Sequence, residues 1–380
     1  DNQGLTTMAL LQGTSNSETL YGTTGADSLY GQDGDDILYG RSGDDLIRGG
    51  AGDDRLLGES GTDTLYGEDG NDILHGGTDV SYLHGGAGND RLIYDPSAAN
   101  VATIRTSLSA SRLDGDAGTD TVKGDAGNDT IKGGTGIGYL YGGDGNDQIH
   151  YDPTMANVSS IGSYLSGSIL DGDAGYDTLN VYNKAVYTSG GSTKAATTQI
   201  SMSGNGGDIY FGSPTGSPQI DAGHFQEVEK ITVTGSGKLE FYNYYDSQGI
   251  DITGTAGNDL FYSYGANDTL RGGAGNDDFH SYGGYDTIVS TSTDNDRFYF
   301  DTTFTGSATV TGFNGAGAYG GDRIYFDDYY DYMDTVASVS EYGNRTTFHV
   351  TTTYYGSTYG DMTVTVDKVG LEEGVDWFFV

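Results

Sequence analysis

One pattern dominates the chain: a glycine recurs every nine residues from Gly13 to Gly85. Within each nine-residue segment the sixth position is acidic in nearly every copy and the eighth is aliphatic, as in Asp36 and Leu38. Such a fixed, short period is typical of solenoids, whose coils are too small to bury a core alone and must stack on their neighbours. We therefore expect a glycine-rich turn and a very short strand in every coil.

The charge balance indicates what such a stack needs. The 380 residues include 55 Asp and Glu against 17 Lys and Arg, a formal charge of −38, and 35% of the residues are hydrophobic. Self-repulsion opposes a compact state, and ordinary globular proteins are roughly 45–50% apolar. Acids that recur at one repeat position indicate a small hard cation bound coil by coil, and calcium accepts oxygen ligands in loose geometry. The same balance excludes the basic surface that nucleic-acid binding requires.

Other features of the composition narrow the class. The chain contains no cysteine, which excludes disulfides and thiolate metal sites. Its apolar runs all fall short of the roughly 20 residues that span a bilayer, so we expect no transmembrane helix. Because the numbering begins at Asp1 rather than at a methionine, we expect a processed or trimmed chain.

A longer period overlays the short one. The string YDPSAANV at Tyr94 recurs as YDPTMANV at Tyr151, and we interpret both places as coils with enlarged turns. The nine-residue rhythm stops after Asn180 and returns at Gly254, with alternating strand patterns between them. The expected organisation is a lead at 1–12, a repeat array over 13–180, an irregular β segment over 181–250, a second array over 251–295 and an all-β cap over 296–380.

The segments GGAGNDRLI at Gly85, GGDGNDQIH at Gly142 and GGAGNDDFH at Gly272 resemble the nonapeptide of the repeats-in-toxin (RTX) calcium-binding proteins. The resemblance implies an all-β, right-handed parallel β-roll, in which two nonapeptides make one turn and calcium ions lie between successive turns on two rims. It also implies that the position-six aspartates bind these ions, helped by carbonyl groups of the turn glycines. The implied aspartates are Asp27, Asp36, Asp45, Asp54, Asp63, Asp72, Asp90, Asp120, Asp129, Asp147, Asp177, Asp259, Asp268, Asp277 and Asp286. The implied glycines are Gly31, Gly49, Gly67, Gly85, Gly142 and Gly272.

Two coils lack the acid at position six. Ser81 takes this position in the coil that starts at Gly76, and Gly138 takes it in the coil that starts at Gly133. If coils alternate between two rims, each of these turns is next to an enlarged turn. We therefore interpret the missing acids as correlated with a remodelled neighbour, where a calcium site would lack its partner, rather than as decay of the repeat.

The C-terminus carries a second resemblance. The ending Asp376, Trp377, Phe378, Phe379 and Val380 is similar to the acid-then-hydrophobic ending of serralysin-type substrates of bacterial type I secretion. The string GDRIYFDD before it resembles the strand region that follows their β-roll. This resemblance implies an uncleaved export signal and an extracellular or cell-surface location.

The sequence predicts a protein without catalytic activity. It lacks the His-Glu-x-x-His zinc helix of the serralysins, and its fragment HFQEVE at His224 has the wrong spacing. Position nine of the coils holds histidines and tyrosines, which we interpret as a solvated strand face in preference to a strip for glycans or a neighbouring subunit. These position-nine residues are Tyr30, Tyr39, Tyr66, His75, His84, Tyr141 and His150.

Three function classes follow from these observations. The first is a secreted calcium-binding structural protein of the cell surface or matrix, such as a self-assembling surface-layer or sheath subunit. The second is an adhesin or glycan-binding module, with cell-surface polysaccharide as its partner. The third is the calcium-binding and export portion of an exoenzyme. We favour the first, because enzyme-free repeats, extreme acidity and an abundance of tyrosine, 31 residues, suit wet contacts between proteins.

Overall fold

A computed structural model gives the fold of the chain, and the segments it describes contain strands, turns and no helix. None of them therefore forms a helix long and apolar enough to cross a membrane. The described residues are 8–77, 81–93, 112–117, 120–124, 128–133, 138–151, 169–183, 186–189, 192–195, 197–203, 206–212, 220–235, 237–244, 248–291, 294–314, 321–327, 334–355, 357–368, 371, 373 and 376–379.

The chain divides into two compact units. The first comprises residues 1–154, 163–182 and 222–228, and the second comprises residues 155–162, 183–221 and 229–380. The strands assigned mainly to the first unit are β1 (Leu10–Gln12), β2 (Thr19–Tyr21), β3 (Ser28–Asp33), β4 (Ile37–Ser42), β5 (Leu46–Ala51), β6 (Arg55–Ser60), β7 (Thr64–Asp69), β8 (Ile73–His75), β9 (Tyr82–Ala87), β10 (Arg91–Ile93), β11 (Arg112–Ala117), β12 (Asp120–Lys123), β13 (Thr130–Lys132), β14 (Gly138–Tyr141), β15 (Asp144–Gly145), β16 (Gln148–Tyr151), β17 (Ile169–Asp171), β18 (Ala174–Gly175), β19 (Thr178–Asn183) and β24 (Ile220–Gln226).

The strands of the second unit are β20 (Val186–Ser189), β21 (Ser192–Ala195), β22 (Thr197–Ser203), β23 (Gly206–Gly212), β25 (Lys230–Gly235), β26 (Leu239–Asn243), β27 (Asp251–Thr253), β28 (Leu260–Tyr264), β29 (Thr269–Arg271), β30 (Asp278–Tyr282), β31 (Gly284–Val289), β32 (Arg297–Asp301), β33 (Thr305–Thr311), β34 (Arg323–Asp327), β35 (Asp334–Tyr342), β36 (Arg345–Tyr354), β37 (Ser357–Val366) and β38 (Trp377–Phe379).

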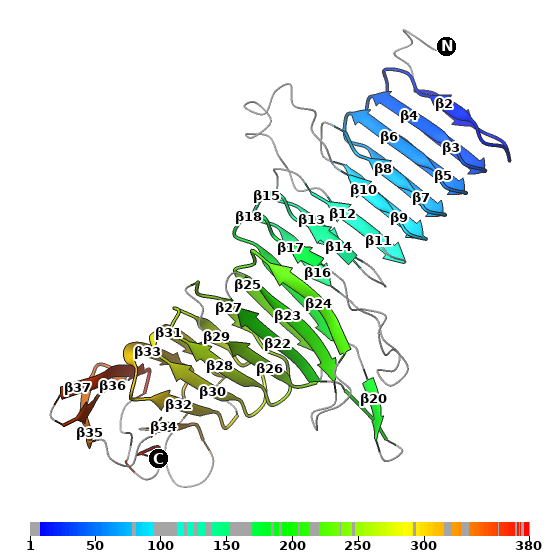
Figure 1. Cartoon of the computed structure of the whole chain (residues 1–380). Helices are drawn as coiled ribbons and strands as arrows, with labels where there is room; N and C mark the ends of the chain where they lie inside the picture. The colour runs from blue at the N-terminus through cyan, green and yellow to red at the C-terminus, as the bar shows by residue number, and fades with distance from the viewer. Residues whose placement is uncertain are drawn as a thin grey trace. The chain divides into compact units, whose positions relative to one another are not determined.

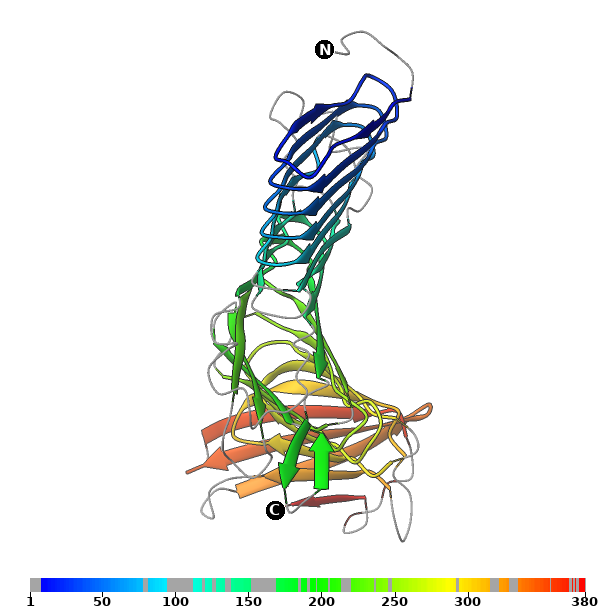
Figure 2. The same ribbon diagram turned by 90° about the vertical axis from the view of Figure 1, so that its right-hand side faces the viewer.

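In the first unit the coils stack as a parallel β-roll (Figures 1 and 2). Each strand pairs with the next strand but one, so that Leu29 lies beside Ile47 and Ile47 lies beside Leu65. Odd- and even-numbered strands up to β10 thus form two separate sheets. From Leu29 to Leu92 the position-eight side chains fill the space between the sheets and are fully buried. The expected all-β parallel roll, with two nonapeptides in each turn, is confirmed.

The enlarged turns appear as larger sequence separations between paired strands. Tyr82 pairs with Arg112 and Tyr139 pairs with Ile169, whereas ordinary partners such as Leu46 and Thr64 are much closer in sequence. The additional residues fall within 94–111 and 152–168, which lie outside the described residues. A skip of this kind leaves the ladder of strands unbroken on both sides of each insertion.

The second unit combines parallel coils with antiparallel hairpins. Strands β26, β28, β30, β32, β34 and β38 pair in parallel one after another, so this pairing continues past residue 295. The core side chains of this sheet are aromatic, with Phe241, Phe261, Phe279 and Phe298 one above another in register, whereas those of β25, β27, β29 and β31 are aliphatic. Strands β35, β36 and β37 form an antiparallel meander joined in parallel to β33. Phenylalanine supplies more buried area per coil than leucine or isoleucine.

Candidate metal sites

The position-six aspartates form ladders along the coils. Within a ladder the backbone N–H of one aspartate donates a hydrogen bond to Oδ1 of the aspartate one full turn later. The N–H of Asp36 donates to Asp54 at 2.7 Å, and the N–H of Asp54 donates to Asp72 at 2.8 Å. This bond fixes the carboxylate against its own rim, because a side chain that accepts from a buried amide cannot rotate freely.

Five such ladder segments include the fifteen predicted aspartates, each of which is buried. They run from Glu18 through Asp36, Asp54, Asp72 and Asp90 to Asp120; from Asp27 through Asp45 to Asp63; from Asp129 through Asp147 to Asp177; from Asp259 through Asp277 and Asp296 to Asp322; and from Asp268 to Asp286.

The second carboxylate oxygen has a different environment. Oδ2 of Asp36, Asp45, Asp54, Asp72 and Asp277 is buried and has no hydrogen-bond partner. A buried acceptor left in this state costs about 1–3 kcal/mol, and more when it is charged. These oxygens therefore need a donor or a cation.

The glycine at position one leaves room beside this oxygen. A Cβ atom at Gly40 would lie 2.5 Å from Oδ2 of Asp45 and 2.9 Å from the carbonyl oxygen of Gly58 in the next turn of the roll. The two oxygens thus converge on a space that only glycine leaves open. All six predicted glycines place their carbonyl oxygen in this way, each beside the position-one glycine of the preceding coil on its rim; they are Gly31, Gly49, Gly67, Gly85, Gly142 and Gly272.

Burial also changes the acidity of the ladder carboxylates. It raises the pKa of Asp45 and Asp72 to about 7, that of Asp54 to about 6 and that of Asp277 to about 8. Hydrogen bonds from backbone N–H groups lower these pKa values in part, while the neighbouring carboxylates of the same ladder raise them further. At neutral pH without a cation, these groups hold costly negative charge or take up protons.

Carboxylate and carbonyl oxygens from successive turns, with unpaired lone pairs and with no nitrogen or sulfur donor, suit calcium. The model of the RTX calcium-binding nonapeptide repeat matches residues 12–47, 40–74, 48–83, 66–95, 106–140, 124–152 and 253–288. The chain carries RTX calcium-binding repeats. No curated protein matches it. The predicted resemblance to the RTX nonapeptide is thereby confirmed, and these repeats support the predicted calcium binding.

The RTX ladders extend beyond the residues that the sequence predicted. Asp277 donates its N–H to Asp296, and Asp296 donates to Asp322, both at 2.8 Å. Burial raises the pKa of Asp296 to about 7 and that of Asp322 to about 6. Because these acids are spaced 19 and 26 residues apart instead of 18, the periodicity conceals them.

Two further sets of polar residues escaped the sequence analysis. At position five, side chains form an outer ladder: the N–H of Asn71 donates to Asp53 at 2.8 Å, and that of Asn89 donates to Asn71 at 2.9 Å. Threonine also occupies position two near the start of both arrays, and the hydroxyls of Thr23 and Thr255 donate to the position-six carboxylate of their own turn. In the sequence, the recurring Gly-Asn-Asp and Gly-Thr strings could have indicated these two sets of residues.

The acid-free turns lie where the sequence indicated. Ser81 is fully buried, and its hydroxyl donates to the carbonyl oxygen of Gly76 at 3.4 Å. The strand that follows Ser81 pairs with the strand that follows residue 111. Gly138 pairs with Asp120, and the next strand on that rim begins at Ile169. Each acid-free turn therefore precedes an enlarged turn in the stack.

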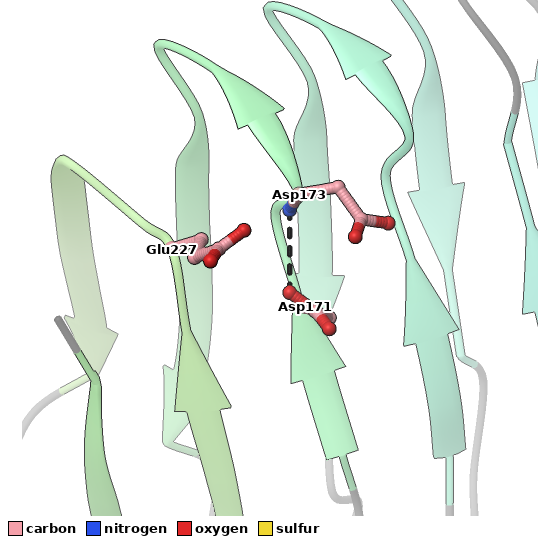
Figure 3. Close-up of side chains that lie close together, drawn as sticks. All are labelled: Asp171, Asp173 and Glu227. Atoms are coloured by element: carbon pink, nitrogen blue, oxygen red, sulfur yellow. Dashed lines mark hydrogen bonds between the residues drawn. The ribbon is translucent and has the colours of Figure 1, made fainter.

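A separate carboxylate cluster ends the first unit's array (Figure 3). Asp171, Asp173 and Glu227 each offer an oxygen, and these oxygens lie within 4.8 Å of one another. Asp171 accepts the N–H of Asp173 at 3.3 Å and the side-chain amide of Gln226 at 2.6 Å. At Gly172 the carbonyl oxygen of Glu227 takes the place that a glycine carbonyl has in other coils. The cluster could hold a cation with oxygen ligands only, and one of its three residues, Glu227, directly follows β24, outside any repeat.

The C-terminal residues form part of the second unit's core. Strand β38 pairs in parallel with β34, and the N–H of Ile324 donates to the carbonyl oxygen of Asp376 at 2.9 Å. Trp377 is buried against Phe326 and Phe348, with ring centroids 6.3 and 5.4 Å away. Val380 lies outside the described residues. The expected export signal is thus folded into the sheet.

Proposed function

We propose that this chain is a secreted, non-catalytic structural protein of the cell surface or extracellular matrix, which calcium folds and which then associates with further copies of itself. The RTX ladders support the first step. Unpaired buried carboxylate oxygens oppose folding until a cation neutralises them, so calcium binding contributes directly to folding.

The open edge of β35 is the observation that carries self-association. This nine-residue strand pairs with β36 on one side, and among the described residues no strand register occupies its other side. Val339 and Tyr342 are exposed on it, and Tyr342 and Tyr355 at the ends of the hairpins are more than nine-tenths exposed. A long edge with exposed apolar side chains is a template for pairing with another chain.

The outer aromatic side chains give less support to the glycan-binding alternative. On β26, β28, β30 and β32 a row of rings stacks face to face, with Tyr262 and His280 4.4 Å apart and His280 and Tyr299 4.4 Å apart. The same holds for Tyr66 and His84 in the first unit, at 4.9 Å. Their ring faces are occupied by one another, so they stabilise the stack of coils and present edges and hydroxyls outward.

Sedimentation velocity in millimolar calcium tests the proposal. The wild type should form oligomers, and Val339→Lys should shift it towards monomer, because a lysine on the open edge blocks strand pairing. Tyr285→Lys, at a residue that is 70% exposed on β31, is the matched control and should leave assembly unchanged. Monomeric wild type at high concentration, or equal assembly of all three proteins, would remove the case for a structural lattice through this edge.

A further inference from the structure

The two rims of the second unit differ at position one of their turns. On the rim of Asp259 and Asp277 this position is Gly254 and Gly272, as in the first unit. On the rim of Asp268 and Asp286 it is Ser263 and Ser281, which pair with each other in β28 and β30. Asn243 of β26 pairs with Ser263 of β28, so it lies one turn before Ser263 on the same rim. Every one of these three polar side chains is buried.

The serine hydroxyls occupy the space that glycine leaves open elsewhere. Ser281 donates to Oδ2 of Asp286 at 2.6 Å, and Ser263 donates to Oδ2 of Asp268 through a short hydrogen bond. The Ser263 hydroxyl also lies 3.4 Å from Oδ2 of Asp286, so one oxygen spans the carboxylates of two successive turns. Nδ2 of Asn243 adds a donor to Oδ2 of Asp268 at 3.2 Å.

The opposite rim shows what the hydroxyls replace. Oδ2 of Asp277 is buried without a hydrogen-bond partner. A Cβ at Gly254 would lie 2.6 Å from the carbonyl oxygen of Gly272, so that space remains open to an ion. The glycine rim therefore offers calcium unpaired oxygens, and the serine rim offers it hydroxyls already bonded to the carboxylates.

We propose that Ser263 and Ser281 replace calcium on their rim, and that the gap between Asp268 and Asp286 binds no ion although both turns retain the repeat's aspartate. Calcium requires six to eight oxygens, and here the lone pairs that would face it accept hydroxyl protons instead. Oδ1 of Asn243 is buried without a partner, but one amide oxygen falls far short of that number. This rim of the second unit therefore binds no ion between Asp268 and Asp286 at calcium concentrations that fill the sites on the glycine rims.

Counting the calcium ions bound by the full-length chain tests this inference. Equilibrium dialysis should show one further ion in the double variant Ser263→Gly/Ser281→Gly than in the wild type, because the variant recreates the glycine cradle. The control, Ser263→Ala/Ser281→Ala, removes the hydroxyls but keeps the Cβ atoms, so it should gain no ion. A folded glycine variant that binds no additional ion, or an alanine variant that loses one, would overturn the proposal.

A measurement on the wild type covers the case in which the glycine variant does not fold. Crystals grown with terbium in place of calcium should show anomalous scattering peaks beside Asp277 and none between Asp268 and Asp286. A peak between these two carboxylates would show that the serines assist a metal ion instead of replacing it.

Discussion

Replacing Asp54 by asparagine should change stability in opposite directions with and without calcium. Asp54 is 2% exposed; Oδ1 accepts the N–H of Asp36, and Oδ2 has no partner. An asparagine keeps the accepting oxygen, removes the buried charge and places an amide group near the carbonyl oxygen of Gly67, with which it can form a hydrogen bond.

The magnitude follows from the acidity of the carboxyl group. Burial raises the pKa of Asp54 from its ordinary value of 3.8 to about 6. A difference of one pKa unit is worth about 1.4 kcal/mol, so ionised Asp54 destabilises the calcium-free fold by at most ~3 kcal/mol at pH 8. Solvent screening beside the rim lowers this to about 1–2 kcal/mol. In calcium, loss of a charged ligand should weaken binding about tenfold or more, which is ~1.4 kcal/mol in the opposite direction.

Circular dichroism during urea unfolding at pH 8 measures the free energy of unfolding in both conditions. Where chelator unfolds the wild type, titration with trimethylamine N-oxide measures the same difference. Asp53→Asn is the matched control, since it removes the same charge at the exposed position five, where Asn71 already makes the equivalent contact. It should change stability by less than about 0.5 kcal/mol in either condition. Destabilisation of Asp54→Asn both with and without calcium would refute the reasoning.

Three further predictions concern pH, glycine and export. Burial raises the pKa of Asp45 to about 7 and that of Asp277 to about 8, so the stability that these groups contribute is complete below their ordinary pKa of 3.8 and is lost as pH rises through 7 to 8. Thermal melting in chelator should therefore show a less stable fold at pH 8 than at pH 5. The reverse order would contradict this assignment. Gly49→Ala places a Cβ 2.8 Å from the carbonyl oxygen of Gly67, so it should lower the free energy of unfolding by about 1–3 kcal/mol and reduce the amount of bound calcium. The control Gly343→Ala is strained by its φ of +66° but has open space around the Cβ, so it should lower the free energy of unfolding by about 1–2 kcal/mol and leave calcium binding unchanged. Equal calcium binding by both variants would exclude the position-one glycine as part of a calcium site. Deleting residues 376–380 should retain the protein inside a host that carries a type I system, and Trp377→Ala, which removes the packing but keeps the ending, separates a lost signal from a lost fold; normal export of the truncated chain would count against a C-terminal signal.

The nine-residue period predicted the coils correctly, because one inward-pointing side chain per coil is enough to define a β-roll. Leu29, Ile47 and Leu65 are completely buried, as position eight requires. The period also located the ladder aspartates, since every ninth residue reaches one of the two rims. It could not show that Oδ1 of each aspartate is already used by a backbone N–H, because that bond joins coils a full turn apart.

The features hidden from the sequence are those in which spacing or residue type departs from the repeat. Asp322 joins its ladder across a longer connection. Glu227, which follows β24 outside the arrays, joins the carboxylate cluster of Asp171 and Asp173. Ser263 and Ser281 differ from the glycine usual at position one by a single hydroxymethyl group, yet their hydroxyls fill the space beside the carboxylate. Only atomic contacts distinguish these turns from calcium sites.

Hydrogen–deuterium exchange with and without calcium tests the central claim most directly, namely that ions on the glycine rims hold the coils of the RTX array together. The amides of Asp36, Asp45 and Asp54 donate to carboxylates of the next turn, so peptides covering residues 22–92 report on the ladders themselves. The account predicts strong protection of these peptides in millimolar calcium and rapid exchange in excess chelator at pH 8. Equal protection in both conditions would contradict it.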